Sequence, residues 1–228
     1  MLRARIDGAL ASACPDRQDV TSGRLLGQLA PWLRLPFTTP GMRIGLLGGS
    51  FNPAHAGHRH ISLEAMARLD LDRVWWLVSP GNPLKSREDL ASQETRIRRA
   101  EAVAMHPRID VTGFESALGT PYTAEVLAQL ARQTPGRHLV WLMGADNLAS
   151  FHRWRHWERI AGLTPFAVLD RPGWRSKALH SQAASALARF RLPESAAREL
   201  ALAPPPAWTF LSIPLNALSS TALRRQNR

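Results

Sequence analysis

The sequence is poor in cysteine and lysine. It has one cysteine, Cys14, and only Lys85 and Lys177 are lysines among its 29 lysine and arginine residues. A single cysteine excludes an internal disulfide framework and is typical of a reducing compartment, so we expect a cytoplasmic protein. Long apolar runs are also absent, and stretches such as 74–78 are far too short to span a membrane. We therefore expect neither a disulfide-stabilised secreted protein nor a membrane protein.

The formal net charge of the chain is strongly positive, at +11. A large positive net charge often indicates a nucleic acid partner. Here the basic residues are scattered rather than gathered in blocks, and nearly all are arginines beside abundant alanine, which is the pattern of a biased genomic base composition. We therefore expect no nucleic acid partner, although a polyanionic substrate would benefit from the charge.

Two common phosphate-binding loops are missing, because neither G-x-x-x-x-G-K-[ST] nor G-x-G-x-x-G occurs. Residues 48–58 instead have the sequence G-G-S-F-N-P-A-H-A-G-H, between a strand-like run at 43–47 and an amphipathic segment at 58–69. A strand that breaks at two glycines before a helix presents free backbone N–H groups to an anion. His55 and His58 add side-chain donors, so this segment predicts a phosphate site.

The histidines of this segment leave other interpretations open. His55, His58 and His60 could bind a metal, but His58 and His60 point to different faces of a helix. No cysteine or obvious carboxylate accompanies them, so we expect no metal ligands from protein side chains. A glycine pair between a strand and a helix can also serve tight packing alone.

Apolar, strand-like segments alternate with helical ones from Met42 onward. Strands are expected at 43–47, 73–78, 109–114, 138–143, 165–169 and 208–213, and helices at 58–69, 94–105, 124–133, 150–160, 181–190 and 194–202. Apolar strands that alternate with helices predict a parallel sheet covered on both faces. The sequence thus predicts an α/β fold with a Rossmann-like parallel sheet, whose ligands bind at the carboxyl ends of the strands.

Motifs at opposite ends of this region resemble those of the HxGH nucleotidyltransferases. One is the segment 48–58, and the other is Ser219-Ser220-Thr221-Ala222-Leu223-Arg224, which is similar to the superfamily's Ser-Ser-Thr-x-Ile-Arg. Three stretches between them narrow the likeness to the bacterial nicotinate-nucleotide adenylyltransferases: Asn82-Pro83-Leu84-Lys85, Pro121-Tyr122-Thr123, and Gly144-Ala145-Asp146 followed by Phe151 and Trp154. The resemblance covers residues 42–224.

The resemblance implies transfer of AMP from ATP to nicotinate mononucleotide, which gives nicotinate adenine dinucleotide and pyrophosphate in NAD biosynthesis. The acceptor phosphate is already an anion, so its in-line attack on the α-phosphate needs no general base, only positioning and charge neutralisation. Mg²⁺ is expected with ATP, held by phosphate oxygens and water. The sequence leaves two alternatives to this reaction.

One is the same type of transfer to another acceptor: nicotinamide mononucleotide, phosphopantetheine, or an alcohol phosphate paired with CTP. The other belongs to a different class and is a basic RNA-binding module with a degenerate nucleotide fold.

The resemblance also implies which residues act on ATP. The implied catalytic residues are His55, His58, Lys85 and Arg224, with His58 nearest the charge that develops at the α-phosphate. The implied ATP-binding residues are Gly49, Ser50, Phe51, His55, His58, Ser219, Ser220, Thr221 and Arg224. Two alternatives remain, because Lys85 and Arg224 could be solvated surface charges and the Ser-Ser-Thr run could be a helix cap alone.

The implied acceptor-binding residues are Tyr122, Thr123, Asp146 and Trp154. Asp146 would contact ribose hydroxyls, although an N-capping aspartate is the alternative. Trp154 would stack on the pyridine ring, although a tryptophan is more often a core residue. The residue after Trp154 is Arg155, where family members often have an aromatic residue, and an arginine there suits a carboxylate ligand.

The first 41 residues differ from the rest of the chain. They carry five arginines and three aspartates and end in Pro40-Gly41. Transit peptides lack acids, and secretory signals have a longer apolar stretch. We expect residues 1–41 to be a disordered extension, or Met42 to be the real start, although 25–35 could form a short docking helix. Residues 42–228 are then one nucleotidyltransferase domain. The sequence does not decide whether this domain forms a homo-oligomer.

Overall fold

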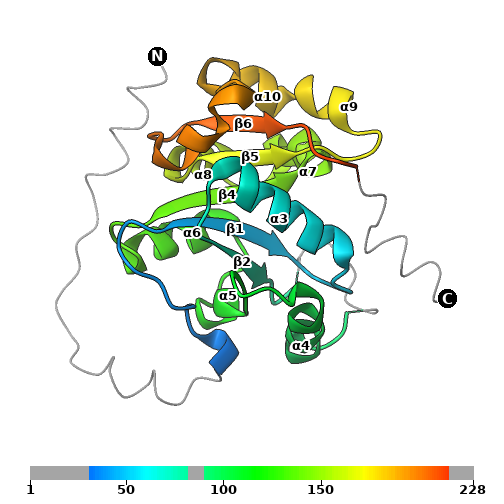
Figure 1. Ribbon diagram of the computed structural model, residues 1–228, viewed down its shortest axis with the longest axis vertical. Helices are drawn as coiled ribbons and strands as arrows, with labels where there is room; N and C mark the ends of the chain where they lie inside the picture. Colours follow the sequence, from blue (N-terminus) through cyan, green and yellow to red (C-terminus); the bar gives the residue numbers. More distant parts are fainter. Residues whose placement is uncertain (1–30, 82–89, 216–228) are drawn as a thin grey trace. The chain divides into compact units, whose positions relative to one another are not determined.

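The computed structural model describes residues 31–81 and 90–215. Within them one sheet is formed by β1 (Arg43–Gly49), β2 (Arg73–Val78), β3 (Ile109–Thr112), β4 (His138–Gly144), β5 (Phe166–Leu169) and β6 (Trp208–Leu211). The strand order is β3-β2-β1-β4-β5-β6, and every neighbouring pair is parallel (Figure 1). The predicted Rossmann-like parallel sheet is confirmed. From β1 the chain adds strands toward one edge of the sheet as far as β3, and from β4 it adds them toward the other edge. Ligands in such sheets bind at this switch point, between β1 and β4.

Helices cover both faces of this sheet. They are α3 (Ala56–Leu69), α4 (Gln93–Ala104), α5 (Phe114–Ala117), α6 (Thr123–Gln133), α7 (Ala145–Ser150), α8 (Trp157–Leu163), α9 (Arg175–Leu179) and α10 (Gln182–Ala186), with shorter 3-10 segments η2 (Pro31–Leu33), η3 (Phe151–Arg153), η4 (Ala188–Phe190) and η5 (Glu194–Leu202). Figure 1 shows α3 crossing in front of the sheet. None of the helices in the described parts of the chain is long and apolar enough to cross a membrane.

Successive side chains along each strand point to opposite faces of the sheet and pack into two separate hydrophobic cores. Leu46 and Trp75 point to one face, where they pack with apolar residues of α6, α7, α8 and α10. Their neighbours Leu47 and Trp76 point to the other face, where they pack with α3, α4 and η5. Because both faces are buried, the central strands β1, β2 and β4 have no polar face, which is why their interior positions are apolar.

Three of the expected helices differ from the structure. The helix expected over 150–160 is wrong, because η3 ends at Arg153 and α8 starts only at Trp157. The backbone between them turns at His156, whose φ of 56° is left-handed. The helix expected over 181–190 is divided into α10 and η4, and 194–202 is a 3-10 segment kinked at Ala196. Apolar spacing reports burial, and it does not distinguish one continuous helix from short pieces.

Two parts of residues 31–41 are tied to the sheet domain: Trp32 and Arg34 contact the end of the edge strand β3, and Thr38 and Gly41 contact residues 136–137 before β4. The backbone carbonyl of Trp32 accepts hydrogen bonds from the N–H of Gly113 (2.7 Å) and the hydroxyl of Thr112 (3.1 Å). A Cβ on Gly113 would lie 2.6 Å from the Trp32 ring, so only glycine permits this approach. The compact unit of the described chain starts at Pro31, before the predicted domain start at Met42.

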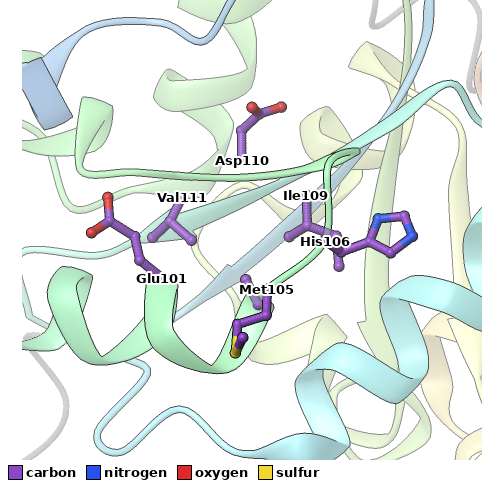
Figure 2. A pocket seen from close by; sticks show the side chains of 7 residues that line it. Glu101, Met105, His106, Ile109, Asp110 and Val111 are labelled. Atoms are coloured by element: carbon purple, nitrogen blue, oxygen red, sulfur yellow. The ribbon is translucent and has the colours of Figure 1, made fainter.

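A surface hollow of about 350 Å³ lies between the end of α4 and the start of β3 (Figure 2). Its lining includes Glu101, Met105, His106 and Asp110. These residues are at the amino end of β3, whereas ligands in parallel α/β sheets bind at the carboxyl ends. The hollow is therefore not part of the candidate site.

Candidate active site

The turn after β1 follows directly from two residues of the glycine-rich motif, Gly48 and Phe51. A Cβ on Gly48 would lie 2.4 Å from the Trp141 ring, so a side chain cannot be accommodated there. Phe51 is 1% exposed and has φ of 47°, a left-handed conformation that costs free energy for a non-glycine residue. Its ring stacks on Trp76 with centroids 5.1 Å apart and an interplanar angle of 16°. This burial holds the strained turn in place.

His55 and His58 close the start of α3 by capping each other. His55 is the N-cap, and its Nδ1 accepts the backbone N–H of Gly57 at 3.1 Å. The Nδ1 of His58 accepts the backbone N–H of His55 at 3.2 Å. An imidazole nitrogen that accepts a hydrogen bond carries no proton, so both rings are neutral with the proton on Nε2. Each ring therefore has one N–H donor that the cap does not use.

The surroundings also keep both rings neutral. Burial, and then the positive charge of Arg171, lower the pKa of His55 from 6.5 to about 4. Burial is again the main cause for His58, followed by the neighbouring His55, and lowers its pKa to about 3. The ring centroids are 3.9 Å apart, so two neutral donors lie side by side at the carboxyl end of β1.

Asp146 and Arg171 face each other at the ends of the adjacent strands β4 and β5. Arg171 Nη1 lies 2.9 Å from Asp146 Oδ2, and both side chains are about 30% exposed (30% and 29%). A Cβ on Gly144 would lie 2.4 Å from Asp146 Oδ1 and 2.8 Å from Arg171 Cδ, so a side chain at this position would displace the ion pair. The N-cap of α7 is Gly144, so the alternative of an N-capping Asp146 is wrong.

Arg171 is a site residue that the sequence reasoning missed. Its charge acts on both His55 and His58, so it connects the donors after β1 with the carboxylate after β4. The signal was present, because Arg171 closely follows a correctly predicted strand, and residues in that position line the ligand crevice. Scattered arginines elsewhere in the chain obscured it.

The expected acceptor residues form a second group. Trp154 follows η3, is half-buried, and meets Phe151 edge to face with centroids 5.4 Å apart. Tyr122 and Thr123 are also half-buried, at the start of α6. The Arg155 guanidinium lies over the Tyr122 ring, 4.3 Å from its centroid, in a cation–π contact. The residue that departs from the family pattern therefore contacts an expected acceptor residue.

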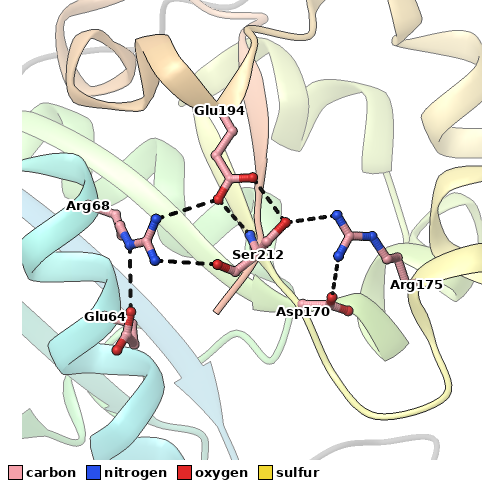
Figure 3. Close-up of polar contacts among 6 residues, drawn as sticks. All are labelled: Glu64, Arg68, Asp170, Arg175, Glu194 and Ser212. Atoms are coloured by element: carbon pink, nitrogen blue, oxygen red, sulfur yellow. Dashed lines mark hydrogen bonds and ion pairs between the residues drawn. The ribbon is translucent and has the colours of Figure 1, made fainter. Parts of the chain in front are cut away.

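The expected residues Lys85, Ser219, Ser220, Thr221 and Arg224 lie outside the described residues. The chain leading to the second motif is nevertheless fixed as it leaves β6 (Figure 3). Glu194 accepts hydrogen bonds from the backbone N–H (2.8 Å) and the hydroxyl (3.0 Å) of Ser212. Arg175 donates to the same hydroxyl at 2.8 Å and binds Asp170 at 3.0 Å. This network ties the end of β6 to the end of β5.

Comparison with known proteins agrees with this geometry. Residues 46–226 match the cytidylyltransferase-like family. The chain belongs to that family. It is 57% identical over 183 residues to the probable nicotinate-nucleotide adenylyltransferase of Methylorubrum extorquens (strain PA1), covering 80% of this chain and 99% of that relative. It is 53% identical over 189 residues to the protein of the same name from Roseobacter denitrificans, covering 83% and 94%.

Solved structures of the cytidylyltransferase-like fold also match. One is Plasmodium falciparum nicotinic acid mononucleotide adenylyltransferase complexed with NaAD, with a TM-score of 0.60 and 17% identity over 80% of this chain and 82% of the other. The same enzyme complexed with APC gives a TM-score of 0.58 at 16% identity, over 81% and 83%. At this identity the likeness concerns the fold.

Proposed function

We propose that the protein transfers AMP from MgATP to nicotinate mononucleotide, releasing pyrophosphate and forming nicotinate adenine dinucleotide. The observation that carries the proposal is the pair of neutral histidines, His55 and His58, at the point where the strand order reverses. Relatives more than half identical to this chain are named nicotinate-nucleotide adenylyltransferases. Because the donor is ATP and the product serves NAD biosynthesis, we expect the enzyme to act in the cytoplasm.

The two Nε2–H groups suit the chemistry of this reaction. The acceptor phosphate attacks the α-phosphorus in line, and negative charge spreads over the oxygens of the transferring group and the leaving pyrophosphate. Fixed donors stabilise that charge without reorganising, because the backbone cap already holds both rings. His58 is proposed to serve the α-phosphate and His55 the phosphates beyond it. No proton has to be removed from the nucleophile, so a neutral imidazole is sufficient.

The remaining expected residues keep their proposed roles. Gly49, Ser50 and Phe51 supply backbone to the phosphates, and Lys85 and Arg224 supply positive charge. Ser219, Ser220 and Thr221 supply hydroxyls and a helix start to the same phosphates. Mg²⁺ is proposed to arrive with ATP and to stay bound mainly to phosphate oxygens and water. In the acceptor pocket Asp146 contacts ribose hydroxyls and Trp154 stacks on the pyridine ring.

The choice between acid and amide acceptors depends on polar groups, since nicotinate and nicotinamide mononucleotides have nearly the same shape. The Thr123 hydroxyl and the positive charges of Arg153 and Arg155 favour a carboxylate. An amide would set its own N–H₂ against donors and leave them unpaired, at about 1–3 kcal/mol per buried group. The arrangement therefore supports the acid as substrate.

The test is pyrophosphate release from ATP, measured with each mononucleotide in turn and with phosphopantetheine as a third acceptor. We expect kcat/KM for nicotinate mononucleotide to exceed that for the amide by at least about tenfold. Equal efficiency with both mononucleotides would contradict the acid assignment and leave a dual-specificity enzyme. Tight RNA binding without turnover of any nucleotide would instead support a binding module.

A further inference from the structure

Arg96 is a buried arginine beside the candidate site with no role in the assignments above. It lies in the first turns of α4 and is 1% exposed. Among the described residues its guanidinium donates to backbone carbonyls: to Ala91 from Nε (2.9 Å), to Ser50 and Ser79 from Nη1 (2.6 and 2.8 Å), and to Pro80 from Nη2 (3.3 Å). A planar fork with five donors can do this, whereas a lysine ammonium cannot.

These carbonyls come from three separate segments. Ser50 belongs to the turn after β1, Ser79 and Pro80 follow β2, and Ala91 precedes α4. One nitrogen, Nη1, joins Ser50 to Ser79, and the strand ends are also linked by the Ser79 N–H donating to the Gly49 carbonyl at 2.9 Å. Arg96 therefore fixes the position of the glycine-rich turn relative to the end of β2.

The charge of Arg96 is not matched by a carboxylate among the described residues, where its contacts are carbonyls. Burial lowers its pKa, which reflects the cost of removing the cation from water. Carbonyl dipoles offset part of that cost, and a bound polyanion would offset more. A buried cation behind the turn that is expected to bind a triphosphate suits that ligand.

We propose that Arg96 is a positioning residue for ATP: it holds the Ser50 carbonyl inward, so that the next backbone N–H faces the nucleotide side of the turn. The Ser50–Phe51 peptide bond is trans, so its carbonyl and the Phe51 N–H point in opposite directions. With the carbonyl bound to Arg96, this N–H is directed away from the interior. The proposal rests on the proposed function for the identity of the nucleotide.

The experiment compares Arg96→Lys and Arg96→Met with wild type and with Arg98→Lys, a control on the same helix whose side chain is 76% exposed. Affinities for a non-hydrolysable ATP analogue and for nicotinate mononucleotide are measured separately by calorimetry, and kcat and KM by pyrophosphate release. Melting temperatures identify variants that do not fold. Arg96→Lys keeps the charge and tests the hydrogen-bonding fork alone, so it remains informative if Arg96→Met fails to fold.

We expect Arg96→Lys to lose roughly tenfold or more in analogue affinity and in kcat/KM for ATP, because small displacements of a binding loop are costly. Its affinity for the mononucleotide should stay within about threefold, and Arg98→Lys should resemble wild type. A folded Arg96→Lys with wild-type ATP affinity would overturn the proposal, and so would equal losses for both ligands. Analogue binding reports on Arg96 even if wild type fails to use nicotinate mononucleotide, which would count against the proposed function alone.

Discussion

The two halves of the site were specified by the sequence in different ways. The turn after β1 and the start of α3 have the geometry that residues 48–58 predicted, with strand, glycine turn and helix in that order. The acceptor side, from Asp146 to Trp157, does not, because the single helix expected over 150–160 is interrupted between η3 and α8. The first half is local in sequence, whereas the second depends on residues distant in the chain.

The contacts explain this difference. His55 bonds to Gly57 and to His58 within the motif itself, so the motif carries its own geometry. Asp146 instead bonds to Arg171 after the next strand, and Arg155, in the turn before α8, contacts Tyr122, the N-cap of α6. A local motif is recognisable in sequence as a contiguous pattern, whereas a long-range pair leaves no such pattern. The predictions below test whether the chemistry divides along the same line.

The largest effect is expected in the β1 half, from His58→Ala. Removing a fixed donor to the α-phosphate should lower kcat by roughly a hundredfold or more. Acceptor affinity should change little, because Trp154 and Tyr122 belong to the other half. Steady-state kinetics with a melting curve check this, with His180→Ala as the exposed control. A kcat within a few-fold of wild type would show that His58 does not contact the transition state.

Arg171→Gln should disturb both halves, since this arginine acts on the histidines and bonds to Asp146. We expect kcat/KM to fall on the order of tenfold. Loss of the positive charge should also raise the pKa of His55 and of His58, which side-chain nitrogen NMR measures directly. Arg189→Gln is the exposed control. Unchanged histidine pKa values would mean that the two halves are electrically independent.

The sequence predicted the sheet more fully than the site. All six strands were expected, because apolar segments bounded by turns report burial on both faces. His55 and His58 were found because a named motif contains them. Arg96 was missed because nothing in the sequence of α4 distinguishes this buried arginine from the exposed Arg98 two residues later. Arg171 was missed because its partner Asp146 is 25 residues away in sequence.

Arg155→Gln tests the acceptor half alone. The guanidinium lies over Tyr122 and is exposed, so its contribution to carboxylate recognition should be modest. We expect the preference for nicotinate over nicotinamide mononucleotide to shrink about threefold, through loss of the acid rather than gain of the amide. Competition assays with both acceptors measure this, with Arg159→Gln on α8 as control. An unchanged preference would assign the discrimination to Thr123 and Arg153.

The smallest effect on activity is expected from Glu115, which lies in α5, directly after the edge strand β3 and outside both halves of the site. Burial raises the pKa of this carboxyl from 4.5 to about 8, and the side chain is 6% exposed. At pH 7 it is protonated in the folded chain and ionised in the unfolded chain. The folded state thus binds more protons between pH 4.5 and 8, so this stabilisation is complete below pH 4.5 and is lost as the pH rises toward 8.

Glu115→Gln replaces the protonated acid with a neutral amide of similar shape that does not titrate. Relative to wild type, its free energy of unfolding should rise between pH 5 and pH 8 by at least about 1 kcal/mol, since one pKa unit corresponds to about 1.4 kcal/mol. Other titrating groups occur in both proteins and cancel in the difference. Urea unfolding at the two pH values measures it, with the exposed Glu158→Gln as control. If the difference between variant and wild type is the same at both pH values, Glu115 is ionised in the folded protein, and burial does not raise its pKa as expected.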